Sequence, residues 1–305
     1  MFKTPILILT FKRPEETKKV LDQILSIKPK TLYVFQDGKK INFNENSKKL
    51  YNKTTGLIKD YQKFKCIKYL RFKKNIGQRF IAKKVLDIVF KKEKEIIFLE
   101  DDTFPEKSFF RFCSKMLKKY EKNDKIYHIS GCNVYQGTKN KKINNKSFIL
   151  SKYPQFWGWA TWKQKWNKFY EPEISDWNKN KKEFLNLFQN NKDEKRFFNF
   201  YVENNSKGKH IGWDIPWSYK LILKKKLTLI SGINLIKNIG FNSDPSGKGA
   251  RKFANLKSSD LKFPLKIENS LKPNHIYDNF LHKSFYHRKI LLIRLFYRLL
   301  KIIKK

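Results

Sequence analysis

The stretch Ile96-Ile-Phe-Leu-Glu-Asp-Asp102 joins four apolar residues directly to three carboxylates, with no turn residue between them. The apolar part has the length and composition of a buried β-strand. Adjacent anions repel one another, so folding gains nothing from placing three of them where an apolar strand leaves the core. In parallel α/β sheets the carboxyl ends of the strands form the ligand crevice, and hard oxygen ligands there suit Mg²⁺ or Mn²⁺. The stretch therefore predicts a cation site at a strand end, with a solvated acidic turn as the structural alternative.

The sequence on either side of this stretch alternates strand-like and helical segments. Helical patterns begin at Pro14, near Gln78 and near Phe109, and strand-like runs cover residues 6–10, 31–36, 66–70, 96–99 and 126–130. Such alternation predicts a parallel sheet with crossover helices, so we expect an α/β fold with a mostly parallel sheet flanked by helices. Residues 150–220 look less regular and contain all seven tryptophans, and residues 242–275 look loop-like.

The composition is strongly basic. The chain has 305 residues, with 68 Lys and Arg against 27 Asp and Glu, and a formal net charge of +41. This charge indicates a polyanionic partner, either nucleic acid or an anionic membrane, or else a lysine-rich composition spread over a solvated surface. The three cysteines are scattered, which is typical of a reducing compartment. No apolar run reaches the roughly 20 residues that cross a bilayer, so we expect a cytoplasmic protein.

The final segment, residues 285–305, has the pattern of a basic amphipathic helix. Arg294, Arg298, Lys301 and Lys305 share one helix face, and leucines, isoleucines and Phe296 occupy the rest. This pattern predicts peripheral binding to an anionic membrane surface, on the cytoplasmic face of the inner membrane. The structural alternative is a terminal helix that packs on the core and exposes a basic stripe.

A series of short motifs occurs in a fixed order along the chain. These are Ile6 to Pro14, Phe35-Gln36-Asp37-Gly38, Asn75-Ile76-Gly77, Leu99 to Asp102, Ser130 to Asn133, Trp157 to Trp162, and Asn238 to Phe241. The set resembles the GT-A fold nucleotide-sugar glycosyltransferases, near their bacterial family-2-like branch. The resemblance implies a GT-A domain over residues 1–260, with a nucleotide-binding half at 1–130 and an acceptor-side half at 131–260. A C-terminal extension, residues 261–305, would follow it and carry the basic helix.

The resemblance also implies which residues bind a nucleotide-sugar donor, most commonly a UDP-sugar in that family. The donor contacts would come from Thr10, Phe11, Arg13, Asp37, Arg71, Asn75, Gly77, Glu100 and Asp101. Asp102 would be the direct ligand of Mn²⁺ or Mg²⁺. Many GT-A enzymes complete the metal shell with a C-terminal histidine. Directly after Phe241 this chain has Asn242-Ser243-Asp244 and no nearby histidine, so Asp244 or water would take that position.

The motif Gly212-Trp213-Asp214-Ile215-Pro216-Trp217 carries the candidate general base. In inverting members of the family a carboxylate in this region removes the proton of the acceptor hydroxyl, and we expect Asp214 to do so, with aromatic neighbours that raise its pKa. The alternative is that Asp214 caps a helix that begins near Pro216. Trp157, Trp159 and Trp213 would offer flat faces to the sugar or acceptor, and Gly158 would allow close backbone approach between the rings. For one or two of the three tryptophans in the Trp157–Trp162 block, core packing is the explanation instead.

These observations together predict a metal-assisted glycosyltransferase that acts, with inversion, on a surface-glycan or lipid-linked acceptor such as lipopolysaccharide. A retaining transferase, or a nucleotidyl- or phospho-transferase on the same fold, remains open. A member that binds a nucleotide-sugar without turnover and a basic nucleic-acid or polyanion-binding protein are further alternatives. We expect no specific nucleic-acid partner, because the acidic stretch would repel phosphate unless a metal intervenes.

Overall fold

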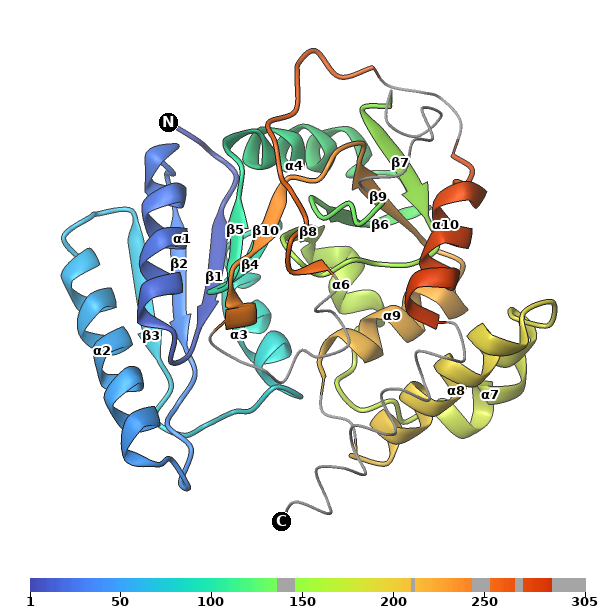
Figure 1. The fold of residues 1–305 in the computed structure, drawn as a ribbon, viewed down its shortest axis with the longest axis horizontal. Coiled ribbons are helices and arrows are strands. Elements are labelled where there is room, and N and C mark those ends of the chain that lie inside the picture. The colour runs from blue at the N-terminus through green and yellow to red at the C-terminus, as the bar shows by residue number, and fades with distance from the viewer. Residues whose placement is uncertain (136–145, 210–211, 243–252, 267–270, 287–305) are drawn as a thin grey trace.

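A central sheet of eight strands runs through the molecule (Figure 1). The computed structural model describes residues 1–135, 146–209, 212–242, 253–266 and 271–286. The strand order is β3-β2-β1-β4-β8-β6-β9-β7. The bounds are β1 Ile6–Thr10, β2 Leu32–Gln36, β3 Ile67–Arg71, β4 Glu95–Glu100, β6 Ile126–Ser130, β7 Phe148–Ser151, β8 Trp159–Trp162 and β9 Leu227–Ser231.

The sheet is mixed but mostly parallel. β1 pairs in parallel with β2 and β4, β2 with β3, and β6 with β9. β8 runs antiparallel between β4 and β6, and β7 is antiparallel to β9. Two short strands, β5 (Thr103–Pro105) and β10 (Ile236–Asn238), form a separate antiparallel pair. The predicted α/β fold class is therefore confirmed.

Helices cover both faces of the sheet because β1 presents alternate residues to each face. Ile6 and Ile8 join a core with α1 (Pro14–Ser26), α2 (Glu45–Tyr61) and α4 (Lys107–Tyr120). Leu7 points to the other face and joins α3 (Ile81–Val89), α6 (Lys163–Phe169) and α9 (Asp214–Leu223). Each of these three strand residues is fully buried, so the sheet is packed on both sides.

The remaining helices extend the second half of the molecule. A further core joins α7 (Trp177–Asn186), α8 (Lys192–Ser206), α9 and α10 (His275–Leu281), and a π-helical turn, His282–Tyr286, follows α10. Residues 150–220 are more regular than expected, because their described part contains the end of β7, β8, α6, α7, α8 and most of α9. The periodicity of this region is hidden in the sequence because aromatic side chains pack on several sides of these helices. The described residues from 242 to 274 contain no strand or α-helix, and α10 begins at His275, the last residue of the segment expected to be loop-like.

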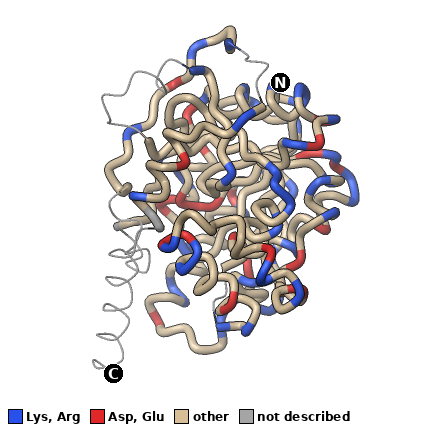
Figure 2. The backbone as a smooth tube through the Cα atoms, turned by 90° about the vertical axis from the view of Figure 1, so that its right-hand side faces the viewer, with Lys and Arg blue, Asp and Glu red and all other residues tan. Residues whose placement is uncertain are grey.

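Two expectations about the surface are only partly covered by the structure. The basic segment at 285–305 lies outside the described residues from position 287 onward. Figure 2 shows Lys and Arg on several sides of the outline rather than on one face. Within the described ranges, no helix combines the length and the apolar character that crossing a membrane requires.

The three cysteines are unpaired.

Candidate functional site

The order in which the chain adds strands to the sheet reverses between β1 and β4. From β1 the chain adds β2 and β3 on one side, and it then returns to add β4 on the other side (Figure 1). Both strands end at the same edge because they are parallel, with Leu9 opposite Glu100. Ligands of open α/β sheets bind in the crevice outside such a switch point. The acidic stretch Glu100 to Asp102 therefore lies at the position where a ligand site is expected.

The three carboxylates at the end of β4 meet a cation from the loop after β1. We call Glu100, Asp101 and Asp102 the carboxylate cluster. Arg13 Nη1 lies 2.8 Å from Asp101 Oδ1 and 3.1 Å from Asp102 Oδ2. The backbone N–H of Phe11 donates to the other oxygen of Asp101 at 3.0 Å. Asp101 is therefore held by both a charge and a backbone donor from one loop.

The second half of the chain closes over Asp102. β10 pairs with β5 directly after the cluster, and Ile239 N–H donates to the Asp102 carbonyl at 2.8 Å. A Cβ at position 240 would lie only 2.5 Å from Asp102 Oδ2, so the close approach requires glycine. Asp102 is 9% exposed, and its Oδ1 is buried without a hydrogen-bond partner among the described residues.

Burial makes the negative charge of the cluster costly. It raises the pKa of Glu100 to about 8, with a further contribution from the charge of Asp102. Burial also raises the pKa of Asp102 to about 6, although the Arg13 guanidinium favours the charged form. The pKa of Asp101 is raised for the same reason and is opposed by the same arginine. Among the described residues, Arg13 alone thus does not compensate the two buried aspartates and the partly buried Glu100.

This arrangement suits a divalent cation that is bound to the protein through a single side chain, Asp102. The unpartnered Asp102 Oδ1 is a hard oxygen donor in a buried acidic setting, as Mg²⁺ and Mn²⁺ prefer. The described part of the chain holds no group of three His, Cys, Asp or Glu side chains that would enclose a metal alone. Mg²⁺ is commonly bound through one or two carboxylates together with substrate phosphates and water. Asp244, the expected second ligand, lies outside the described residues.

The loop beside β2 is organised by Asp37. Its carboxylate accepts hydrogen bonds from the backbone N–H groups of Gly38, Ile76 and Gly77 and from Asn75 Nδ2, at 2.7–3.0 Å. Gly77 has φ +79°, a left-handed conformation that favours glycine. Asp37, Asn75 and Gly77 thus lie together, and these bonds occupy the four acceptor positions of Asp37 and hold the loop itself.

The other expected donor-binding residues surround the same edge. Thr10 is buried, and its hydroxyl donates to the Phe35 carbonyl at 2.9 Å, so it ties β1 to β2. The Phe11 ring packs on Phe43 with centroids 5.4 Å apart. Arg71 is exposed at the end of β3.

Asp214 is the first residue of α9 and is half-buried. Its charge acts on Tyr170, whose pKa is raised by burial and then by Asp214, against the effect of Arg79. The preceding residue reaches the cluster, because Trp213 Nε1–H donates to Glu100 Oε1 at 3.2 Å. The candidate base and the carboxylate cluster are therefore joined through one side chain.

The Trp157–Trp162 block is mainly core. Trp159 is 0% exposed and stacks on His128 and Phe98, with centroids 5.0 and 5.1 Å away, so the expectation of a substrate contact was wrong for this residue. Trp213 is also buried, and its ring lies among aromatic neighbours. Trp157 is partly exposed and packs edge-on against Phe241. Gly158 has φ +62°, and a Cβ there would meet Ile236 at 2.4 Å.

Several residues that organise the site were missed by sequence reasoning. Gln36 donates to the Phe11 carbonyl, Asn205 donates to the Gly212 carbonyl, and Tyr170 donates to the Trp213 carbonyl. Each of these side chains acts across a long sequence separation or from a segment without a recognisable motif. Only the folded chain brings them to the site.

No protein-family model matches the chain, and no curated protein matches it. Among solved structures, the chain is similar to TarS 1–349 from S. aureus, to the mannosyltransferase PcManGT from Pyrobaculum calidifontis in complex with GDP-Man and Mn²⁺, and to the glycosyltransferase GlyE of Streptococcus pneumoniae TIGR4. The identities are 11%, 8% and 9%, and the TM-scores are 0.37, 0.40 and 0.34, respectively.

The matches cover 56%, 74% and 75% of this chain and 51%, 70% and 45% of the other chains, in the same order. This chain thus spans about half of TarS 1–349 and less than half of GlyE. Glycosyltransferases are among its structural neighbours, as the resemblance implied. At these values we take neither an activity nor a residue role from them.

Proposed function

We propose that the chain transfers a sugar from a nucleotide-diphosphate donor, bound at the switch point between β1 and β4, to an acceptor hydroxyl. The observation that carries this proposal is the carboxylate cluster, with Arg13 and the unpartnered Asp102 Oδ1, at that edge of the sheet. A buried excess of negative charge is unfavourable for folding unless a cationic group or ligand offsets it. A complex of a divalent cation and a diphosphate supplies the cation and brings its own anionic oxygens to Arg13.

The residues of the site divide between donor and acceptor. Asp102 would hold Mn²⁺ or Mg²⁺, and when bound the cation offsets the negative charge that develops on the leaving diphosphate. Arg13 and Asp101 would bind the donor, and the loop held by Asp37 would lie beside the nucleotide, most simply a uridine nucleotide. Asp214 would take the proton of the acceptor hydroxyl as that oxygen attacks the anomeric carbon, which gives inversion. The acceptor we propose is a surface glycan or a lipid-linked saccharide.

Calorimetry with a panel of UDP-, GDP-, CDP- and dTDP-sugars tests the donor site. We expect one nucleotide class to bind in the presence of Mn²⁺, with binding weakened at least tenfold by chelator or by Asp102→Asn, because both remove the cation that links protein and diphosphate. Asp214→Asn should keep donor affinity within about threefold and lower turnover by roughly 10²–10⁴-fold, as loss of a general base does. If no nucleotide-sugar binds with or without metal, the proposal is wrong.

A further inference from the structure

The start of α9 is held by side chains at three consecutive backbone carbonyls. Asn205 Nδ2 donates to the Gly212 carbonyl at 3.1 Å, and the Tyr170 hydroxyl donates to the Trp213 carbonyl at 3.2 Å. Ser218 Oγ donates to the Asp214 carbonyl at 2.9 Å. These donors come from α8, from the residue after α6 and from α9 itself. The backbone that carries Asp214 is therefore fixed to α8 and to the residue after α6, in addition to the bond within α9.

The Trp213 side chain adds a fourth connection, and it leads to the carboxylate cluster. Its indole N–H donates to Glu100 Oε1 at 3.2 Å, across 113 positions of sequence. The ring is 6% exposed and packs on Phe98 and Phe156, with centroids 5.5 and 5.1 Å away. A ring confined in this way cannot change its direction without moving its neighbours, so the bond to Glu100 ties the end of β4 to the first turn of α9.

We propose that Trp213 is a positioning residue that sets the separation between the carboxylate cluster and Asp214. This inference rests on the proposed function, in which the cluster binds the donor and Asp214 activates the acceptor. The two partners of the reaction are held by elements from different halves of the chain, and within the described residues the Trp213–Glu100 bond joins these elements directly at the site. A displacement of about 1 Å between reacting groups is enough to cost roughly 10²-fold in rate.

The chain contains a matched control for this bond in α9, the helix that Trp213 precedes. Trp217 Nε1–H donates to His128 Nδ1, also at 3.2 Å, and Trp217 is fully buried. Trp213→Phe and Trp217→Phe therefore each remove one buried indole N–H and one hydrogen bond of the same length. They differ in the partner, because His128 belongs to the core on β6 and Glu100 belongs to the cluster.

The first measurement separates rate from donor affinity. With the nucleotide-sugar that binds in the calorimetric panel, and water as the acceptor, release of nucleoside diphosphate gives kcat, and calorimetry gives the donor Kd. We expect Trp213→Phe to lower kcat by roughly 10–100-fold with the donor Kd within about threefold, and Trp217→Phe to leave both within about twofold. Unchanged kcat in Trp213→Phe, or an equal loss in both variants, overturns the inference.

The second measurement does not depend on turnover. In a double-mutant cycle of Glu100→Ala and Trp213→Phe, followed by urea unfolding, we expect non-additive effects, because each substitution removes the same bond. Additive effects overturn the link between β4 and α9. If the wild-type protein binds no nucleotide-sugar, the proposed function is wrong and the role of Trp213 in catalysis falls with it, while a non-additive cycle would still establish the link itself.

Discussion

Asp102 is the residue at which folding and ligand binding oppose each other most directly. Its side chain is almost fully enclosed, one oxygen faces Arg13, and the other is buried without a partner among the described residues. Burial raises its folded-state pKa to about 6, from 3.8. The folded state therefore holds this proton more tightly than the unfolded state, and stability falls as pH rises from about 4 to about 6. Above that range the full cost of the buried charge is present.

Asp102→Asn should therefore stabilise the metal-free protein at pH 8 and have little effect at pH 4. We expect a gain of about 1–3 kcal/mol in the free energy of unfolding at pH 8, since one pKa unit corresponds to about 1.4 kcal/mol. Urea unfolding at the two pH values, in chelator, measures this difference. Asp60→Asn on the exposed surface of α2 is the control and should change stability at neither pH. A loss of stability in Asp102→Asn at pH 8 would contradict the assignment of a costly charge.

At the scale of single residues, the sequence predicted the location of those residues that directly follow a strand. The cluster directly follows a buried strand, and Arg13 follows the neighbouring strand, so the parallel pairing of β1 and β4 is enough to bring them together. The burial of Trp159 could not be predicted in this way. It depends on His128, Phe98 and Trp213, which reach the same place from three separate segments.

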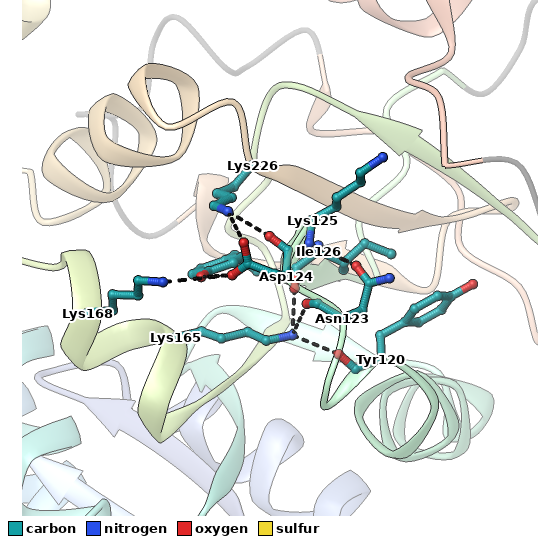
Figure 3. Close-up of polar contacts among 9 residues, drawn as sticks. Tyr120, Asn123, Asp124, Lys125, Ile126, Lys165, Lys168 and Lys226 are labelled. Carbon is teal, nitrogen blue, oxygen red and sulfur yellow. Dashed lines mark hydrogen bonds and ion pairs between the residues drawn. The ribbon is translucent and has the colours of Figure 1, made fainter.

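At the scale of elements, the C-terminal end of α4 depends on a buried lysine from α6. Lys165 Nζ donates to the carbonyls of Tyr120, Asn123 and Ile126 at 2.7–2.9 Å (Figure 3). It also lies 3.5 Å from the centre of the Trp162 ring. Tyr120 is the last residue of α4, and the last carbonyls of a helix have no partner within it. The Lys165 ammonium has three donors, so it can serve this carbonyl together with one from the turn after α4 and one from β6. Lys165 thus links α4, the start of β6 and α6.

Lys165→Met keeps the apolar stem and removes the three donors. We expect a loss of about 2–4 kcal/mol in the free energy of unfolding, because buried carbonyls lose their partners. Lys168→Met, on the same helix, removes an exposed ion pair to Asp124 at 3.8 Å and a cation–π contact 5.5 Å from the Phe169 ring centre, and it should cost less than about 0.5 kcal/mol. Urea unfolding of the two variants compares them, and equal losses would show that the carbonyl contacts contribute nothing specific.

Element boundaries were predictable where one strand or helix has its own pattern. β1 and β6 occupy the predicted residues, and α1 begins at Pro14 as expected. The insertion of β8 between β4 and β6 was not predicted, because four residues around Trp159 carry no alternation and their pairing depends on strands more than 25 residues away. α2 was missed for a related reason: its polar face dominates a segment with few apolar positions.

For the whole molecule, the net charge of +41 must be separated from the charge of the final segment. Lys and Arg occur on several sides of the described chain, which is typical of a solvated basic surface (Figure 2). The sequence pattern of residues 285–305 is different, because four basic residues share one face of the predicted helix beside a wide apolar arc. Both features attract anionic lipid, but only the second combines charge with apolar burial in the interface.

Vesicle sedimentation of two variants that each lose four basic residues distinguishes the overall basic surface from the basic face of residues 285–305. We expect substitution of Arg294, Arg298, Lys301 and Lys305 by Gln to weaken binding to phosphatidylserine-containing vesicles at least tenfold, since each basic residue near such a surface contributes about 1 kcal/mol. The control replaces Lys48, Lys49, Lys53 and Lys59 on α2 by Gln, which removes the same charge elsewhere and should change binding less than threefold. Equal losses in the two variants would mean that the membrane responds to total charge, and the terminal helix would then have no special role in association.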